Sequence, residues 1–416
     1  MQFRLLVLAV GTFVINTGSY LVAGVLPAIA EHVGVPVTTA GQLVTVHALT
    51  YAISAPVLST VVGSWERRKL LWLSLALFVV GNIATALAPD FGTLTAARVL
   101  GALGASLFTP TAVVIAADLV PLDRRGRAVS MVLGGLTLAT VIGVPLGVLL
   151  EESVGYQGLF WMIAGLGVLA STALLALPPV PAPPAMRLGE RISVLRNRAV
   201  VWVLVVSMLA SLADFAAYTY ASPMLSALTG AGAGTLGVLL FVYGVAGAMG
   251  NAVVGRITDR FGSGVGIAGS LLLLTAGLMF LPLAGGSLPA TGALLVLWGL
   301  GGWGIMPAVQ HRLISATPSG AAVVIAFNSS ALYLGMGFGG ITGGAVAAQW
   351  GWWALGPASA AVAVLALVLF WRMPTTAPEP EAVPAQHEVG GADGPRAARS
   401  TGGSPDPRLR GAAEGA

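Results

Sequence analysis

Cysteine is absent from this chain of 416 residues, and charged side chains make up only 9% of it. The absence of cysteine excludes disulfides and thiolate metal sites. Soluble domains carry about 25% charged residues, so the scarcity of charge argues against a soluble protein. Hydrophobic residues, in contrast, account for 56% of the chain. Together these proportions predict an integral membrane protein.

Sequence patterns typical of catalysis are also absent. The chain contains no H-E-x-x-H, no G-x-S-x-G and no phosphate-binding loop, and these are the patterns that accompany metalloprotease, hydrolase and nucleotide chemistry. Two G-x-G-x-x-G runs, which begin at Gly299 and Gly335, follow no strand and so do not indicate nucleotide binding. We therefore expect no enzymatic activity, no catalytic residue, no metal site and no cofactor.

Long apolar runs separated by short breaks occupy most of the sequence. They predict helices near residues 5–29, 41–63, 70–88, 93–117, 128–150, 158–177, 199–226, 235–255, 265–284, 290–311, 320–347 and 353–371. A helix needs about 20 apolar residues to cross the hydrocarbon core of a bilayer. Because the runs are continuous and do not alternate with polar residues, they exclude a β-barrel. The predicted fold class is an all-α membrane protein with twelve transmembrane helices.

Lys and Arg residues are distributed very unevenly among these segments. If the N-terminus is cytoplasmic, all of them except Arg98 fall in cytoplasmic segments, and no outer loop carries any. Cytoplasmic loops of membrane proteins are enriched in Lys and Arg. We therefore expect a multi-pass protein of the cell (inner) membrane with both termini in the cytoplasm. The net charge of +4 then reflects topology, and nucleic acid is not an expected partner.

The sequence matches itself at an offset of 196 residues, where turn-type residues coincide. The coincident pairs are Pro27 with Pro223, Gly34 with Gly230, and Gly41 with Gly237. Internal repeats of this kind are common in transporters. The offset indicates that a unit of six helices has been duplicated within the chain.

This duplication predicts two pseudo-symmetric six-helix bundles, at residues 1–177 and 199–373. Between them, residues 178–198 contain PPVPAPP followed by four arginines, which is typical of a cytoplasmic linker. Residues 374–416 are rich in Pro, Gly and Ala without periodicity, so we expect a disordered cytoplasmic tail.

Asp214 lies within the apolar run at residues 199–226. A rise of about 1.5 Å per residue places it about 22 Å along the helix, inside a hydrocarbon core about 30 Å thick. An ionisable side chain at that depth costs from about 3 to more than 10 kcal/mol, and it usually faces a water-filled cavity. Two interpretations stay open: Asp214 carries a proton during transport, or it is held between helices as structural glue.

A short segment after the eighth predicted helix, GNAVVGRITDRFG at residues 250–262, combines glycines with charged residues. We interpret it as a turn in which a carboxylate caps the next helix. The segment resembles the signature loop of the major facilitator superfamily. The matching positions are Gly255, Asp259, Arg260 and Gly262. In that family the loop latches the two bundles together on the cytoplasmic side.

The same family carries this loop also after its second helix, and the 196-residue offset leads there to VLSTVVGSWERRKLL. In this copy Gly63 stands where Asp259 stands in the second, and only the basic end remains, at Arg67, Arg68 and Lys69. The acid of the first latch is therefore missing. The three basic residues are explained equally well as a loop that sets topology.

Two further motifs resemble the same family. Arg98, in LTAARVLGALGAS, is similar to the arginine of the family's fourth span, which is associated with proton transfer. The run GGLTLATVIGVPLG is similar to its antiporter motif in span 5, with Gly143, Pro145 and Gly147 retained. Spacing alone would also suit ordinary helix packing.

The overall pattern most resembles the twelve-span drug:proton antiporter and sugar efflux branch, which includes the chloramphenicol-resistance and arabinose-efflux permeases. Ser19 departs from it, since that branch commonly has a glutamate there. The resemblance implies a secondary active transporter that works by alternating access, with a proton gradient as its energy source. We expect proton-coupled efflux of a small amphipathic molecule by a monomer in the bilayer. A sugar or nutrient uniporter or importer of the same fold is the alternative.

The expected site follows from this resemblance and from the position of the charges. Asp214 is the acid and Arg98 the base that fall within predicted spans, and we predict that they act as a coupled pair. Aromatic and hydrogen-bonding residues of the predicted spans would line a cavity for a drug-sized ligand. The candidates are Asn16, Tyr20, Phe215, Tyr218, Tyr220 and Gln310.

Overall fold

The computed structural model describes residues 2–62, 64–121, 124–181, 194–284, 286–317 and 320–373. Regular structure in these ranges is entirely helical, without a strand. Eleven helices of the described chain are long and apolar enough to cross a membrane. One of them spans 52 residues but is interrupted at Gly155, where φ is 67°, so it supplies two spans. The predicted all-helical, twelve-span fold is confirmed.

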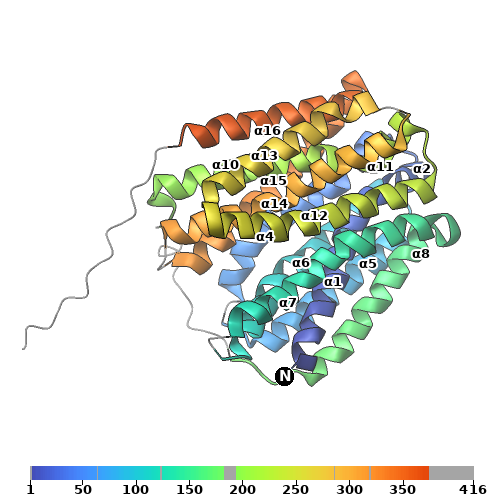
Figure 1. Cartoon of the computed structure of the whole chain (residues 1–416). Helices are drawn as coiled ribbons and strands as arrows, with labels where there is room; N and C mark the ends of the chain where they lie inside the picture. Colours follow the sequence, from blue (N-terminus) through green and yellow to red (C-terminus); the bar gives the residue numbers. More distant parts are fainter. Residues whose placement is uncertain are drawn as a thin grey trace, which may run out of the picture. The chain divides into compact units, whose positions relative to one another are not determined.

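The helices of the first half are α1 (Gln2–Gly24), α2 (Leu26–His32), α3 (Val37–Ala40), α4 (Gln42–Val61), α5 (Arg67–Leu87), α6 (Phe91–Asp118), α7 (Arg125–Leu138), the π-helix η2 (Ala139–Gly143), α8 (Val144–Ala173) and η3 (Leu174–Ala176). Those of the second half are η4 (Val194–Arg196), α10 (Arg198–Tyr218), α11 (Ala221–Thr229), α12 (Ala233–Phe261), α13 (Ser263–Phe280), η5 (Leu281–Ala284), α14 (Leu288–Ala316), α15 (Ala321–Trp350), η7 (Trp352–Ala354) and α16 (Leu355–Trp371). Figure 1 shows the long helices running side by side. The predicted tail at 374–416 and linker residues 182–193 lie outside the described ranges.

The duplication inferred from the sequence is visible in these boundaries. Shifting the first half by the 196-residue offset brings α5 onto α13 and α6 onto α14 to within a few residues at each end. It also brings the short helix α2 onto α11, so that each half has a break after its first long helix. The repeated six-helix unit is thus confirmed as a repeated structure, while the domain boundaries stay a prediction.

The continuous helices predicted for residues 5–29 and 199–226 are wrong at this break. In the structure α1 ends at Gly24 and α10 ends at Tyr218. Pro27 and Pro223 lie in the first turns of the short helices that follow, where a missing N–H is tolerated. In an uninterrupted helix each proline would remove a hydrogen bond and clash with the preceding turn.

The turn predicted for residues 250–262 is also shorter than expected. Helix α12 continues to Phe261, so Gly255, Asp259 and Arg260 belong to its last turns. Asp259 does not cap the next helix, because α13 starts from Gly262 without a side-chain cap. The chain reverses at Gly262 itself, where φ is 88°. Only glycine adopts such a conformation without strain.

Glycines on α15 allow that helix to pack directly on the backbone of α10. A Cβ atom at Gly335 would stand within 3.0 Å of the backbone of α10, as would one at Gly339 or Gly343. Their four-residue spacing in the sequence places all three on one face of the helix, and this face makes the close contact. Small residues of this kind are typical of helix interfaces in membranes, where packing has to replace the hydrophobic effect.

The most extensive contacts between the two halves of the chain are those of α4 with α15 and of α8 with α12. Thr45 Oγ1 donates a hydrogen bond to the Gly337 carbonyl at 3.3 Å. On the other side, Leu149 fills the space beside Gly237. Both contacts are located in the part of the helices that extends from their middle to the ends predicted to face outside.

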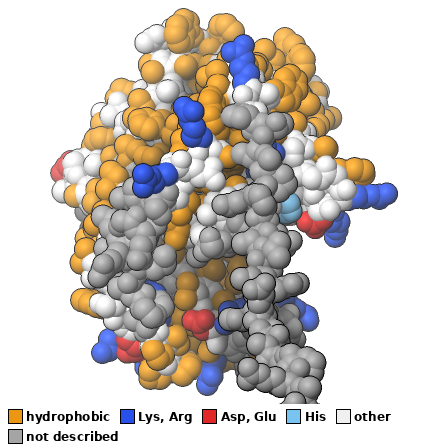
Figure 2. Space-filling view, turned by 90° about the vertical axis from the view of Figure 1, so that its left-hand side faces the viewer, with side chains coloured by type: hydrophobic (Ala, Val, Ile, Leu, Met, Phe, Trp, Pro, Cys, Tyr) orange, Lys and Arg blue, Asp and Glu red, His pale blue; other side chains and the backbone are white. Residues whose placement is uncertain are grey.

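Basic residues gather at the opposite ends of the helices. Figure 2 looks onto this face, over which Lys and Arg side chains are distributed among hydrophobic ones. Arg4 near the start of α1, Arg256 near the end of α12 and Arg372 after α16 all belong to this end. The arrangement agrees with the sequence-based topology, in which this face is cytoplasmic.

Reporter fusions test that orientation. Reporters placed after Lys69, Arg127, Arg187 and Arg260 should all be cytoplasmic, because the positive-inside bias puts every one of these basic segments on one side. Reporters at Gly155 and Gly232 should be external. A cytoplasmic signal at either glycine would contradict the twelve-span topology.

Gly335→Val should destabilise the protein by about 1–3 kcal/mol or more, because the larger side chain would be forced against the α10 backbone. The matched control is Gly269→Val on α13, where a Cβ would meet no atom within 4 Å. Thermal unfolding of both purified variants in detergent checks this expectation. Equal melting temperatures would show that α10 and α15 can separate without loss.

Candidate functional site

Asp214 lies on α10 with only 4% of its surface exposed, and neutral hydrogen-bond donors surround its carboxylate. Trp298 Nε1 donates to Oδ1 at 2.6 Å. The Tyr243 hydroxyl donates to Oδ1 at 3.2 Å and to Oδ2 at 3.4 Å, and it accepts from Trp303 Nε1 at 3.1 Å. A continuous chain of hydrogen bonds therefore leads from Trp303 through Tyr243 to the acid.

The packing of α10, α12 and α14 creates this arrangement. Gly302 on α14 leaves room for the carboxylate, because a Cβ there would stand 2.7 Å from Oδ1. The Tyr243 and Trp298 rings meet edge to face at 5.0 Å, and Tyr218 stacks on Tyr243 at 5.1 Å. Aromatic rings whose polar atoms have found a partner are stable when buried.

Arg98, on α6, is equally buried, with 3% of its surface exposed. Its Nη1 donates to the Gly18 carbonyl at 3.2 Å and its Nη2 to the Ser19 carbonyl at 3.4 Å. Nη2 also lies 3.2 Å from His47 Nδ1 on α4. The guanidinium carbon stands 6.0 Å from the centre of the Phe160 ring. All these groups belong to the first half of the chain.

Arg98 and Asp214 do not contact each other in this structure, and each has neutral partners within its own half. The predicted coupling requires their contact in only one state of the transport cycle. The polar contacts of Arg98 go to α1 and α4, whereas those of Asp214 go to α12 and α14. Their joint role in proton coupling stays a prediction.

The internal repeat relates the partners of these two charges. The 196-residue offset carries His47 onto Tyr243 and Gly18 onto Asp214. In the first half, His47 and Gly18 contact a buried cation; in the second, Tyr243 contacts a buried anion at the position equivalent to Gly18. Sequence reasoning missed His47, Tyr243, Trp298 and Trp303; the offset relates the first two to each other but singles out neither.

Aromatic side chains from both halves meet beside Asp214. Tyr20 stacks on Phe215 at 6.1 Å and meets Trp303 edge to face at 6.2 Å. Tyr51 stacks on Tyr333 at 3.6 Å. We refer to these five residues as the interface aromatic cluster. Because Trp303 also donates to Tyr243, this cluster is in direct contact with the hydrogen-bond chain that ends at the acid.

The predicted cavity residues separate into two groups. Tyr20, Phe215 and Tyr218 lie together next to Asp214. Tyr220 instead lies near the predicted outer ends, where its hydroxyl donates to the Thr38 carbonyl at 3.2 Å and the Gly340 carbonyl at 2.9 Å.

The other two candidates do not join the aromatic group. The Asn16 amide bonds the Thr12 carbonyl of its own helix at 2.8 Å. Gln310 is half-buried on α14, seven residues beyond Trp303 in the sequence.

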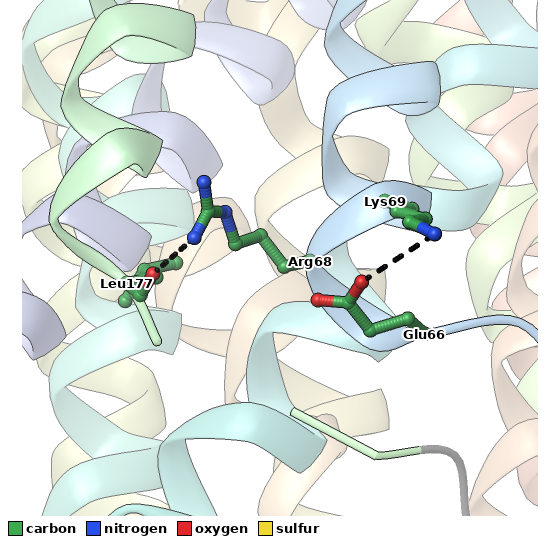
Figure 3. A network of polar contacts seen from close by, with 4 residues as sticks. All are labelled: Glu66, Arg68, Lys69 and Leu177. Carbon is green, nitrogen blue, oxygen red and sulfur yellow. Dashed lines mark hydrogen bonds and ion pairs between the residues drawn. The ribbon is translucent and has the colours of Figure 1, made fainter. Parts of the chain in front are cut away.

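The basic residues Arg67, Arg68 and Lys69 form the first turn of α5, and Arg68 and Lys69 contact groups of the first half. Figure 3 shows Arg68 Nη1 donating to the Leu177 carbonyl at 2.9 Å. Lys69 Nζ lies 3.9 Å from Glu66 Oε2, an exposed pair of a kind that contributes about 0–1 kcal/mol. Gly63, the position of the missing acid, lies outside the described residues. Asp259 is exposed, and the gating role of both loops stays a prediction.

The antiporter-like motif packs α8 against α1. A Cβ at Gly143 would meet Thr17, and one at Gly147 would meet Leu21. Pro145 follows directly after the π-helical turn. π-bulges often mark functional sites. The turn also faces the second half, because its backbone at residues 140–141 lies against Gly244 of α12.

A separate cleft of ≈ 510 Å³ opens between the predicted outer ends of the two halves. It is lined by Pro27, Val148, Glu151, Ser222, Leu236 and Trp352, among others. The residues around Asp214 do not contribute to it. The cleft is therefore distinct from the environment of the buried charges.

Two repeated bundles that enclose buried charges between apolar helices define a multi-pass membrane transporter. The comparisons agree: the family model described as Major Facilitator Superfamily matches residues 8–324. The inner membrane transport protein YdhP of Escherichia coli K12 is 32% identical over 91% of this chain and 97% of its own. The MFS-type transporter YbcL of Bacillus subtilis, itself uncharacterized, is 32% identical over 82% of this chain and 88% of its own. The chain belongs to the Major Facilitator Superfamily.

Solved structures show the same fold at low sequence identity. A bacterial homologue of the human lysosomal transporter Spinster, captured inward-facing and unoccupied, superimposes with a TM-score of 0.73 at 15% identity over 89% of this chain and 96% of its own. A D-xylose–proton symporter superimposes with a TM-score of 0.68 at 17% identity, over 89% of this chain and 97% of its own. At this level of identity the likeness establishes the fold alone.

Tyr243→Phe should lower the melting temperature, because it removes a donor from a buried carboxylate and leaves the Trp303 N–H without its acceptor. Losses of this kind cost about 1–3 kcal/mol. The matched control is Tyr156→Phe on α8, whose buried hydroxyl has no hydrogen-bond partner, so its removal should be nearly neutral. Thermal unfolding of both variants in detergent makes the comparison. Equal shifts would show that the chain of hydrogen bonds contributes nothing to stability.

Proposed function

We propose that this transporter is a proton-coupled exporter of small amphipathic molecules, in which Asp214 carries the proton. One observation supports the proposal above the others: the buried carboxylate has only neutral donors as partners, Trp298 and Tyr243. Intramembrane acids mark proton or ion pathways far more often than they serve packing. No metal or organic cofactor is needed for such a role.

Neutral partners make the acid suitable for repeated changes of charge. If Asp214 were paired with a buried arginine, its protonation would leave that cation unpaired, at a cost of about 3–5 kcal/mol. With Tyr243 and Trp298 as partners, protonation weakens hydrogen bonds that contribute about 1.5–3 kcal/mol each. The Tyr243 hydroxyl can also rotate and accept a hydrogen bond from the protonated acid. Neither the ionised nor the protonated form of Asp214 therefore leaves a buried charge without a partner.

The interface aromatic cluster offers a physical link between this proton site and alternating access. Tyr20 of the first half contacts Phe215, the residue next to Asp214, and Trp303, which bonds Tyr243. Any separation of the halves at this level breaks these contacts and exposes the acid and its donors. A substrate placed among the rings would do the same. Proton binding and substrate binding therefore compete for one environment, as antiport requires.

The proposal places the protein in the inner membrane, as the name of its Escherichia coli relative states for that protein. It also assigns the chain to the drug:proton antiporter and sugar efflux branch, on the resemblance at Arg98 and at the Gly143 to Gly147 motif. The apolar and aromatic surroundings of Asp214 favour an amphipathic substrate over a sugar, because sugars need many more hydrogen-bonding groups than the cluster offers.

Asp214→Asn should reduce uphill export to background, because the amide cannot carry a proton, while downhill flux should persist. A panel of dyes and antibiotics, tested for efflux from a transporter-depleted host with and without an uncoupler, measures this. The matched control is Asp90→Asn at the outer end of α6, an exposed capping acid that should leave export intact. Uncoupler-sensitive export by Asp214→Asn would overturn the proposal, and proton-driven accumulation by the wild type would reverse its direction.

A further inference from the structure

The buried Arg98 and His47 carry hydrogen-bond donors that nothing in the described protein satisfies. Arg98 Nε and His47 Nε2 are both buried and have no partner. The contact between Arg98 Nη2 and His47 Nδ1 fixes the tautomer, because an arginine only donates. His47 Nδ1 must accept, so its proton lies on Nε2. Two N–H groups are therefore left without acceptors.

The charge of Arg98 is also unbalanced. Among the described residues the ion pair is that of Lys69 with Glu66, so no described carboxylate lies within 4.0 Å of the Arg98 guanidinium. Two carbonyls, a neutral imidazole and the face of Phe160 supply partial negative charge, but none is an anion. A buried cation normally has a charged partner, and this one has none within the described part of the chain.

The surroundings leave space on this side of the helix. Gly101, one turn after Arg98 on α6, would carry a Cβ with no atom within 4 Å. Residues three apart on a helix are neighbours on its surface, so this open position lies next to the Arg98 backbone on α6.

The site also adjoins the interface aromatic cluster. Ser19, whose carbonyl binds Arg98, precedes Tyr20 in α1, and His47 lies one turn before Tyr51 in α4. Tyr20 contacts Phe215 and Tyr51 stacks on Tyr333, so both helices lead from the charged groups directly to aromatic rings. A ligand with an acidic end and an apolar body fits this combination.

We propose that Arg98 and His47 form the binding site for a carboxylate-type anionic group of the transported molecule, whose apolar body lies against the interface aromatic cluster. This inference rests on the proposed export function and defines its substrates as amphipathic acids. Arg98 Nε and His47 Nε2 donate to the anion, and the guanidinium neutralises it. The planar fork of arginine matches a carboxylate in a way that a lysine does not.

Binding of a matched pair of probes tests the site. The purified full-length protein in detergent at pH 7.5 is titrated by calorimetry with 2-naphthoate and with its neutral amide, 2-naphthamide. The wild type should bind the acid at least about 10-fold more tightly, since charge-assisted hydrogen bonds contribute about 1.5–3 kcal/mol and each 1.4 kcal/mol is a factor of ten. Equal affinities would overturn the proposal.

Variants separate the two donors and control for folding. Arg98→Gln should abolish the preference for the acid and leave naphthamide binding unchanged, which shows that the variant is folded. Arg98→Lys should retain only part of the preference. His47→Asn keeps an acceptor for Arg98 but removes the second donor, and should weaken naphthoate binding about 3- to 10-fold. Arg372→Gln, an exposed cation outside the site, should behave as wild type. A full preference retained in Arg98→Gln would overturn the proposal.

Two further arms distinguish the origin of the anion and the dependence on export. If acetate alone binds as tightly as naphthoate, with the same loss in Arg98→Gln, the occupant is a small free anion and the assignment to the substrate is overturned. Asp214→Asn should keep the preference for naphthoate, because the titration uses no proton gradient. Failure of proton-coupled export would therefore leave this result unaffected, and the two proposals can fail separately.

Discussion

A charge buried among apolar helices must be satisfied by the groups that the fold places around it, and most features of this structure follow from that constraint. Desolvation of an ion costs several kcal/mol even after relaxation. Asp214 meets the constraint with indole and phenol donors, and Arg98 with backbone carbonyls and an imidazole. Neither uses an oppositely charged side chain, so each stays free to exchange its charge state or its ligand.

The internal repeat explains how two such sites arose with opposite sign. Each half brings together its first, second and fourth long helices, and the positions of His47 and Tyr243 correspond within the repeat. One framework can thus hold a cation on α6 or an anion on α10, according to which helix supplies the charge. The two proposals assign proton binding to the second half and binding of an anionic group to the first half, because the buried charge is an anion on α10 and a cation on α6.

Glycines and aromatic rings set how closely the helices around these sites approach. Gly335, Gly339 and Gly343 bring α15 onto the α10 backbone, and Gly302 admits the Asp214 carboxylate. The rings of Tyr20, Phe215 and Trp303 then fill the contact between the halves. Rigid bundles joined by such contacts can rock as units, whereas a close-packed interior resists gradual deformation. The transport cycle proposed above would open at this contact between rings.

The sequence alone determined the fold class, the repeat and the placement of both charges within apolar helices, because apolar length, turn residues and the positions of charged residues are local properties of the chain. It also identified the α15 glycines, since a four-residue spacing places them on one face. It did not determine the partners that Asp214 and Arg98 have in this structure. Which side chains meet depends on how α1, α4 and α6, or α10, α12 and α14, pack together. A hydrogen bond between residues 29 or 84 positions apart leaves no local signal, so only the tertiary structure could decide it.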